Sequence, residues 1–111
     1  MDNEVKVWLF DILQSIEEIE TYFGNKPKLF ETFNKDNKTQ RAIERNLEII
    51  GEAISRILKK DPSLLIDNAR KIVDTRNRII HGYNSVTNDF IWGIVINHLP
   101  KLKEDIKKLL S

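Results

Sequence analysis

The feature that most constrains this sequence is the spacing of its apolar residues, which recur at steps of three and four along most of the chain. Such spacing places them on one stripe of an α-helix, and no segment shows convincing strand alternation. Four stripes can be followed: Val5, Trp8, Leu9, Ile12, Leu13, Ile16, Ile19 and Phe23; Ala42, Ile43, Leu47, Ile50, Ile54, Ile57 and Leu58; Ala69, Ile72, Val73 and Ile80; and Phe90, Ile91, Ile94, Val95, Leu99, Leu102, Ile106 and Leu109. The sequence therefore predicts an all-α fold, an antiparallel up-and-down four-helix bundle.

Stop and cap residues set the expected helix ends. Gly24, with Pro27 close behind, ends the first helix, and the second begins at a cap chosen from Asp36, Asn37 and Thr39. Further caps are expected at Asp67 or Asn68 and at Ser85 or Thr87. Asp61-Pro62 predicts a helix restart, followed by an extra short helical turn at Leu64–Ile66, and Pro100 predicts a kink in the last helix.

Length and composition narrow the class of protein. The chain has 111 residues and no cysteine, so we expect one domain over residues 1–111 without disulfides or thiolate metal sites. No apolar run approaches the roughly 20 residues of a membrane span, and no secretory signal is visible, so a cytoplasmic protein is expected. The net charge of +1 argues against a protein that binds duplex DNA through many phosphate contacts. It does not argue against nucleic-acid binding at one local site.

Side chains with catalytic chemistry cluster in one segment near the end of the third predicted helix. On an uninterrupted helix, the step from Arg76 to His81 leaves the two side chains roughly 140° apart. Asn77 and Arg78 instead share a face with His81. Arg76 therefore meets His81 of its own chain only if the helix tightens or ends there, for which Gly82 is suited. A symmetric dimer with a shared cleft is the other solution.

The chemistry of this cluster suits RNA cleavage without a metal ion. Histidine exchanges a proton near neutral pH, and arginine offers a fixed charge with a fork of donors that matches phosphate. One group would take the proton of the ribose 2′-OH, arginine would stabilise the anionic phosphorus, and a proton would reach the leaving oxygen. For His81 alone, the alternative is a helix-end histidine that interacts with the helix dipole.

The pattern Arg-x4-His-x-Tyr at Arg76, His81 and Tyr83 resembles the HEPN superfamily and, more closely, the HepT-like toxins. The Ile-Gly-Glu-Ala block at residues 50–53 is characteristic of the same group, and the segment 92–102 is similar to it as well. The resemblance covers most of the chain. It implies a HEPN-like helical bundle that dimerises and brings two copies of the motif into one cleft.

The resemblance also implies an activity and a partner. It predicts a metal-independent endoribonuclease toxin without a cofactor, with RNA as substrate and with Arg76 and His81 as the catalytic pair. The expected antitoxin is an MntA-type nucleotidyltransferase that transfers AMP onto Tyr83. Asn77 is expected in a supporting role, while Arg78, inside the motif, either binds substrate phosphate or is solvated.

Three glutamates form a second cluster of charged residues on the second predicted helix. Glu44, Glu48 and Glu52 recur every four residues, and a solvated or ion-paired face is favoured over a metal site because no histidine stands at suitable spacing. Glu52 is the exception, since Gly51 beside it permits close helix packing, and it is expected to orient the motif arginine or to lie at a dimer interface. The alternative function is a non-catalytic helical partner, a substrate-binding or regulatory subunit of a nucleotidyltransferase.

Overall fold

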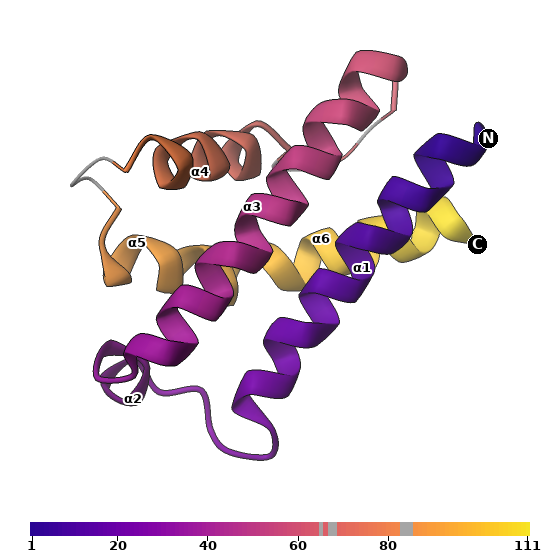
Figure 1. Cartoon of the computed structure of the whole chain (residues 1–111). Coiled ribbons are helices and arrows are strands. Elements are labelled where there is room, and N and C mark those ends of the chain that lie inside the picture. Colours follow the sequence, from indigo (N-terminus) through magenta and orange to yellow (C-terminus); the bar gives the residue numbers. More distant parts are fainter. Residues whose placement is uncertain (65, 67–68, 83–85) are drawn as a thin grey trace.

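The structure, a computed structural model, describes residues 1–64, 66, 69–82 and 86–111, and all of its regular elements are helical. Figure 1 shows their order along the chain. The elements are α1 (Asn3–Phe23), α2 (Phe30–Asn34), α3 (Asn37–Lys60), α4 (Ala69–His81), α5 (Asn88–Gly93), the π-helical segment η1 (Ile94–His98) and α6 (Leu99–Leu110). The all-α prediction is confirmed: α1, α3, α4 and the continuous stretch from α5 to α6 are the long helices of the part described.

The bundle is organised around α3. Figure 1 shows α1 and α3 side by side in opposite directions, while the stretch from α5 to α6 crosses behind them. α4 packs against α3, and α6 packs against α1. The core is almost wholly aliphatic, and among its fully buried side chains are Leu9, Ile12, Ile19, Ile43, Leu47, Ile50, Ile54, Ile57, Ile72, Ile91, Ile94 and Leu102. The predicted stripes are thus the buried faces of the helices, except at Ile80 of the third stripe, which lies near the end of α4 and is exposed. No helix in the described ranges has the length and apolar character that crossing a bilayer requires.

Side-chain caps hold the helix ends where the sequence predicts them. Asp36 is the cap of α3, because its carboxylate accepts a hydrogen bond from the backbone N–H of Thr39, at 3.0 Å. Thr87 caps α5 in the same way through the N–H of Phe90. Gly24 ends α1 at a φ of 56°, a conformation that glycine adopts without steric cost. The alternative caps Asp67, Asn68 and Ser85 lie outside the described residues.

Two local predictions are wrong. Asp61-Pro62 does not restart a helix: the Asp61 carboxylate accepts from the backbone N–H of Ser63, at 3.2 Å, and this local bond holds residues 61–64 in a turn. Leu64 and Ile66 are likewise not helical. The short extra helix is instead α2, where Phe33 is buried and its ring lies 5.2 Å from the ring of Trp92. Tertiary packing of aromatic side chains stabilises this single turn.

The last long helix departs from regular geometry just before Pro100. There the five residues of η1 form a π-helical segment between α5 and α6. Proline has no backbone N–H to donate, and its ring crowds the preceding turn. A π-helical segment accommodates both effects by interrupting the regular hydrogen-bond pattern of the helix. The sequence predicts a kink at Pro100, and the structure shows an irregularity of the helix there, a π-helical segment just before the proline.

Candidate active site

The site is built on an unusually close approach between α3 and α4. A Cβ atom added to Gly51 of α3 would overlap the Cβ of Arg76 and would lie 3.0 Å from its Cγ and 3.2 Å from the carbonyl oxygen of Ile72. Any side chain larger than hydrogen at this position would push α4 away. Gly51 therefore sets the distance between the two helices at the level of Arg76.

The guanidinium of Arg76 is held by two side chains. Its Nη2 donates to Oε2 of Glu52 on α3, and its Nη1 donates to Oδ1 of Asn77, at 2.5 Å. Only 22% of the Arg76 side chain is exposed, so these bonds restrict a side chain that already lies against α3. Its Nε is buried and donates to no group in the described part of the chain, and buried donors of this kind are rare in proteins.

Glu52 is charged and bound on both sides. Its Oε2 accepts from Arg76, and its Oε1 lies 3.3 Å from Nε of Arg56, one turn along α3. The hydrogen bond from Arg76 lowers the pKa of Glu52 below its usual value, and the positive charges of Arg76 and Arg56 act in the same direction. The sequence suggested either an orienting role or a dimer interface for this residue, and the structure places it against the motif arginine.

His81 is the last residue of α4 and is exposed to solvent. Gly82 follows at a φ of 64°, and its N–H bonds to the carbonyl of Ile79, so the predicted helix stop at Gly82 is confirmed. Because α4 is helical up to His81, the helix geometry places the directions of Arg76 and His81 roughly 140° apart. Tyr83, the predicted modification site, lies outside the described residues.

Arg78 turns toward α5 rather than toward Arg76. Its guanidinium carbon lies 4.7 Å from the centre of the Phe90 ring, and Nζ of Lys71 lies 5.8 Å from the same ring. This cation–π contact gives Arg78 a packing partner that the sequence did not suggest. The spacing of Phe90 predicts only a core residue, and nothing in the sequence marks its ring as a contact for two cations.

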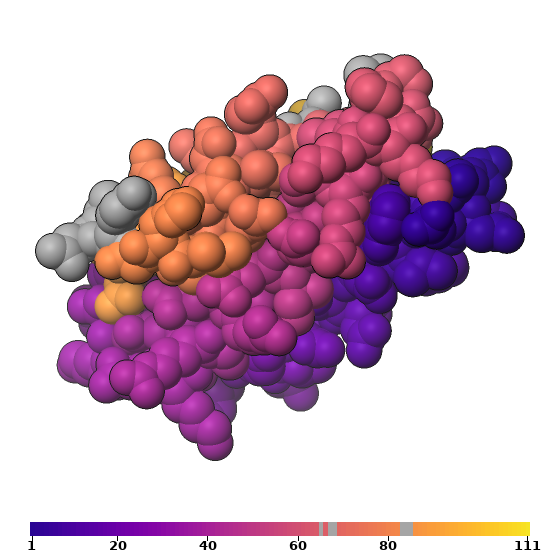
Figure 2. Space-filling model, turned by 45° about the horizontal axis from the view of Figure 1, so that its top comes forward, coloured from indigo at the N-terminus to yellow at the C-terminus, as the bar shows by residue number. Residues whose placement is uncertain are grey.

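A hollow of about 340 Å³ lies beside the Arg76–Glu52 pair, on the face where α3 is flanked by α4 and α1 (Figure 2). We call it the α1–α3 hollow, and its lining consists of Trp8, Asp11, Arg45, Glu48, Ile49, Glu52, Ala53, Arg56 and Ile80. Ile80 belongs to the motif segment of α4, and 54% of this apolar residue is exposed. Arg45 and Glu48 form an ion pair at 3.5 Å, which agrees with the ion-paired face expected for the glutamates of this helix. Apolar and oppositely charged groups thus meet at the edge of the motif.

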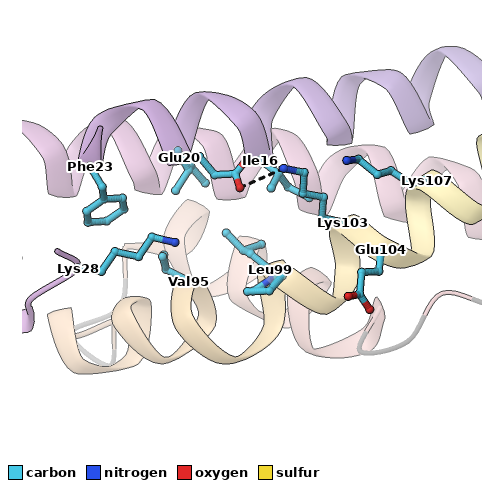
Figure 3. A pocket seen from close by; sticks show the side chains of 11 residues that line it. Ile16, Glu20, Phe23, Lys28, Val95, Leu99, Lys103, Glu104 and Lys107 are labelled. Atoms are coloured by element: carbon cyan, nitrogen blue, oxygen red, sulfur yellow. Dashed lines mark hydrogen bonds and ion pairs between the residues drawn. The ribbon is translucent and has the colours of Figure 1, made fainter. Parts of the chain in front are cut away.

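Another hollow of about 340 Å³ lies between α1 and the α5–α6 stretch (Figure 3). Its floor is apolar and its rim carries Lys28, Lys103 and Lys107, of which Lys103 is bound to Glu20, at 2.7 Å. None of the residues predicted for the site lines it. It is therefore separate from the motif, whose Ile80 lines the α1–α3 hollow.

The end of α4 carries two side chains suited to phosphate chemistry, Arg76 and His81. The guanidinium of Arg76 is a fixed positive charge whose donors match the geometry of a phosphate, and His81 stands exposed at the end of the same helix. Within the described ranges no group of three or more His, Asp or Glu side chains is placed to hold a metal ion. Arg76, Glu52 and Asn77 are in contact in one chain, whereas His81 points in a different direction around α4.

Comparison with known proteins gives the family. Residues 12–109 match the family model described as Ribonuclease HepT-like. A protein of Thermococcus cleftensis named "Probable ribonuclease HepT" is 37% identical over 98% of this chain and 98% of its own length. A protein of Methanocaldococcus jannaschii named as a candidate RNase is 32% identical over 98% of this chain and 89% of its own length.

A further relative, from Caldanaerobacter subterraneus and also named as a candidate RNase, is 34% identical over 74% of each chain. No solved structure matches the chain significantly. The family model covers nearly the whole bundle, including α3, α4 and the motif residues on them. The chain therefore belongs to the Ribonuclease HepT-like family, within the HEPN superfamily.

Proposed function

We propose that this chain is an endoribonuclease whose active site is formed by Arg76 of one subunit and His81 of a second copy. The observation that carries the proposal is the fixed position of Arg76, which is held by Glu52 and Asn77 at the Gly51 crossing while its Nε lacks a partner among the described residues. Family membership and the names of the relatives, which refer to ribonucleases, support RNA as the substrate.

The proposed reaction needs no metal ion. The ribose 2′-oxygen attacks the adjacent phosphorus and loses its proton to a base, the bond from phosphorus to the 5′-oxygen breaks, and that oxygen receives a proton. The products are a 2′,3′-cyclic phosphate and a free 5′-hydroxyl. Arg76 stabilises the extra negative charge on the phosphorus oxygens, and His81 carries one of the two proton transfers, a contribution typically of about 10²–10⁴-fold.

Helix geometry supports the proposal of a second subunit. Since Arg76 and His81 of one chain diverge by roughly 140° around α4, a two-fold axis near the end of α4 can place His81 of the second copy opposite Arg76. Ile80 lies between these two residues, and its exposed side chain borders the α1–α3 hollow. We propose that this apolar edge is covered by the second copy.

We further propose that the activity is that of a toxin acting in the cytoplasm. Its antitoxin would be a nucleotidyltransferase of the MntA type that transfers AMP onto Tyr83. A nucleotide two residues beyond His81 would place bulk and negative charge beside the cleft, and this would compete with RNA phosphate for Arg76.

Expression without an antitoxin tests the function. Wild-type protein should arrest growth, and Arg76→Ala and His81→Ala should each abolish the arrest. The purified wild-type protein should cleave single-stranded RNA in the presence of EDTA. Harmless wild-type expression together with no cleavage in vitro would instead favour the alternative, a non-catalytic regulatory partner of the nucleotidyltransferase.

A further inference from the structure

The outer groove between α3 and α4 lies next to the candidate site, toward the end of α3 and the start of α4. We call it the α3–α4 groove, and it encloses about 240 Å³ lined by Ser55, Leu58, Lys59, Arg70 and Val73. Figure 2 shows the two helices side by side on this face. We propose that this groove binds the phosphates of single-stranded RNA and guides the strand to the cleavage site. This inference rests on the proposed function.

The charge of the groove favours a polyanion. Lys59 stands on the α3 wall and Arg70 on the α4 wall, both are exposed, and neither forms an ion pair or hydrogen bond with the residues that the structure describes. No carboxylate lines the groove in the described part of the chain. Two cations that face one space without a counter-charge attract phosphate, and binding releases the counterions of the nucleic acid.

The α1–α3 hollow, on the same face, differs from the groove in its charge. Its lining carries the carboxylates of Asp11, Glu48 and Glu52, and its arginines are already paired with two of them. With three carboxylates against two arginines, this lining is net negative, and the approach of a phosphate there costs free energy. The α3–α4 groove is therefore better suited to the substrate than the α1–α3 hollow.

The register of α4 connects the groove to the motif. Asn77 and His81 follow Arg70 by seven and eleven residues, which places all three within about 20° of one line along the helix. The line from Arg70 to His81 is about 16 Å long, which corresponds to about five nucleotides at 3.4 Å per stacked base. Asp74 is rotated about 40° from Arg70, on the side away from Val73 and the groove. An RNA strand lying on the groove side thus passes Asn77 and reaches the end of α4.

The floor of the groove fits a single strand. Leu58 and Val73 offer apolar surface to a ribose or to the face of an unpaired base, and the hydroxyl of Ser55 can donate to a phosphate oxygen. With two cations and a net charge of +1 for the chain, this footprint suits a few phosphates of one strand better than the two backbones of a duplex.

Binding should be measured with a labelled single-stranded RNA oligonucleotide and the His81→Ala protein, by fluorescence anisotropy over a range of salt concentrations. The slope of log K against log salt is negative, and removing two phosphate contacts with Lys59→Ala and Arg70→Ala should make it shallower by about 1.4. At about 0.1 M salt the affinity should then fall by about 25-fold. The matched control is Lys6→Ala with Lys38→Ala, which removes the same charge at exposed sites outside the groove. The control should keep nearly the wild-type slope.

Cleavage gives the second readout. In the protein with an intact motif, the groove variant should raise KM by a similar factor and leave kcat nearly unchanged, because the contacts hold the substrate before and during the reaction alike. Circular dichroism should show the same thermal midpoint for the groove variant and the control.

The outcomes separate the two proposals. Wild-type cleavage with an unchanged KM and salt slope in the groove variant would overturn the groove while leaving the ribonuclease proposal intact. RNA binding that depends on Lys59 and Arg70, without any cleavage, would overturn the ribonuclease and retain the groove. Equal losses in the groove variant and the control, or no RNA binding by the His81→Ala protein, would also overturn the groove.

Discussion

Replacing Gly51 with alanine tests whether the close crossing of α3 and α4 positions Arg76. The added Cβ would overlap the Cβ of Arg76 and would press on its Cγ and on the backbone carbonyl of Ile72, at 3.0 and 3.2 Å. Overpacking of this kind costs about 1–3 kcal/mol, while alanine gains about 0.5–1 kcal/mol over glycine within a helix. The net expectation is a loss of about 1–2 kcal/mol in the free energy of unfolding.

Gly93 provides the matched control, because it is helical and a Cβ there would meet nothing within 4 Å. Gly93→Ala should raise the stability by about 0.5–1 kcal/mol, the opposite sign. Thermal unfolding at one fixed protein concentration should show Gly51→Ala about 5–10 °C below the wild type. RNA cleavage should fall with it, since Arg76 moves with α4. A Gly51→Ala protein as stable and as active as the wild type would refute the tight crossing.

Three further predictions concern the same face. Glu52→Gln should lower thermal stability near neutral pH. Because the bond from Arg76 depresses the pKa of Glu52, the difference from wild type should shrink as the pH falls below the usual pKa range of a glutamate, and a constant difference in pH-dependent melts would contradict the ion pair. Ile80→Glu should shift the protein toward the monomer in analytical ultracentrifugation and reduce cleavage, and an unchanged mass would place the interface elsewhere. Tyr83→Phe should keep nuclease activity but escape silencing by the transferase, a result that intact mass spectrometry after incubation with transferase and ATP can check; an adduct still forming on the variant would exclude Tyr83 as the sole acceptor.

Helix positions were predictable because each helix carries its own signals. Apolar spacing marks the buried face, and Asp36, Thr87 and Gly24 act through bonds or backbone conformations that involve only neighbouring residues. The helix restart predicted at Asp61 is wrong because the local sequence is ambiguous. An Asp before proline can cap a helix or, as here through the N–H of Ser63, close a turn. The helix α2 depends on aromatic packing between distant segments, and this is not visible in local spacing.

The candidate site was predictable in its parts but not in its contacts. Gly51 beside Glu52 predicts close helix packing at this point. The structure adds that Cβ and Cγ of Arg76 occupy the space that a side chain at Gly51 would need. The stacking of Arg78 on Phe90 depends on how α5 returns against α4, a tertiary relation that neither stretch encodes alone. The divergence of Arg76 and His81 follows from helix geometry and is retained in the structure, because α4 stays helical to its last residue.

The most direct test of the shared site is complementation between two inactive proteins. Arg76→Ala and His81→Ala should each lack cleavage activity. After the two are unfolded and refolded together at equal concentration, random pairing makes about half of the dimers mixed, and each mixed dimer keeps one intact site of two. The mixture should therefore recover about one quarter of the wild-type rate per chain. A mixture that forms mixed dimers, as native mass spectrometry can verify, and yet remains inactive would contradict a site shared between Arg76 of one subunit and His81 of the other.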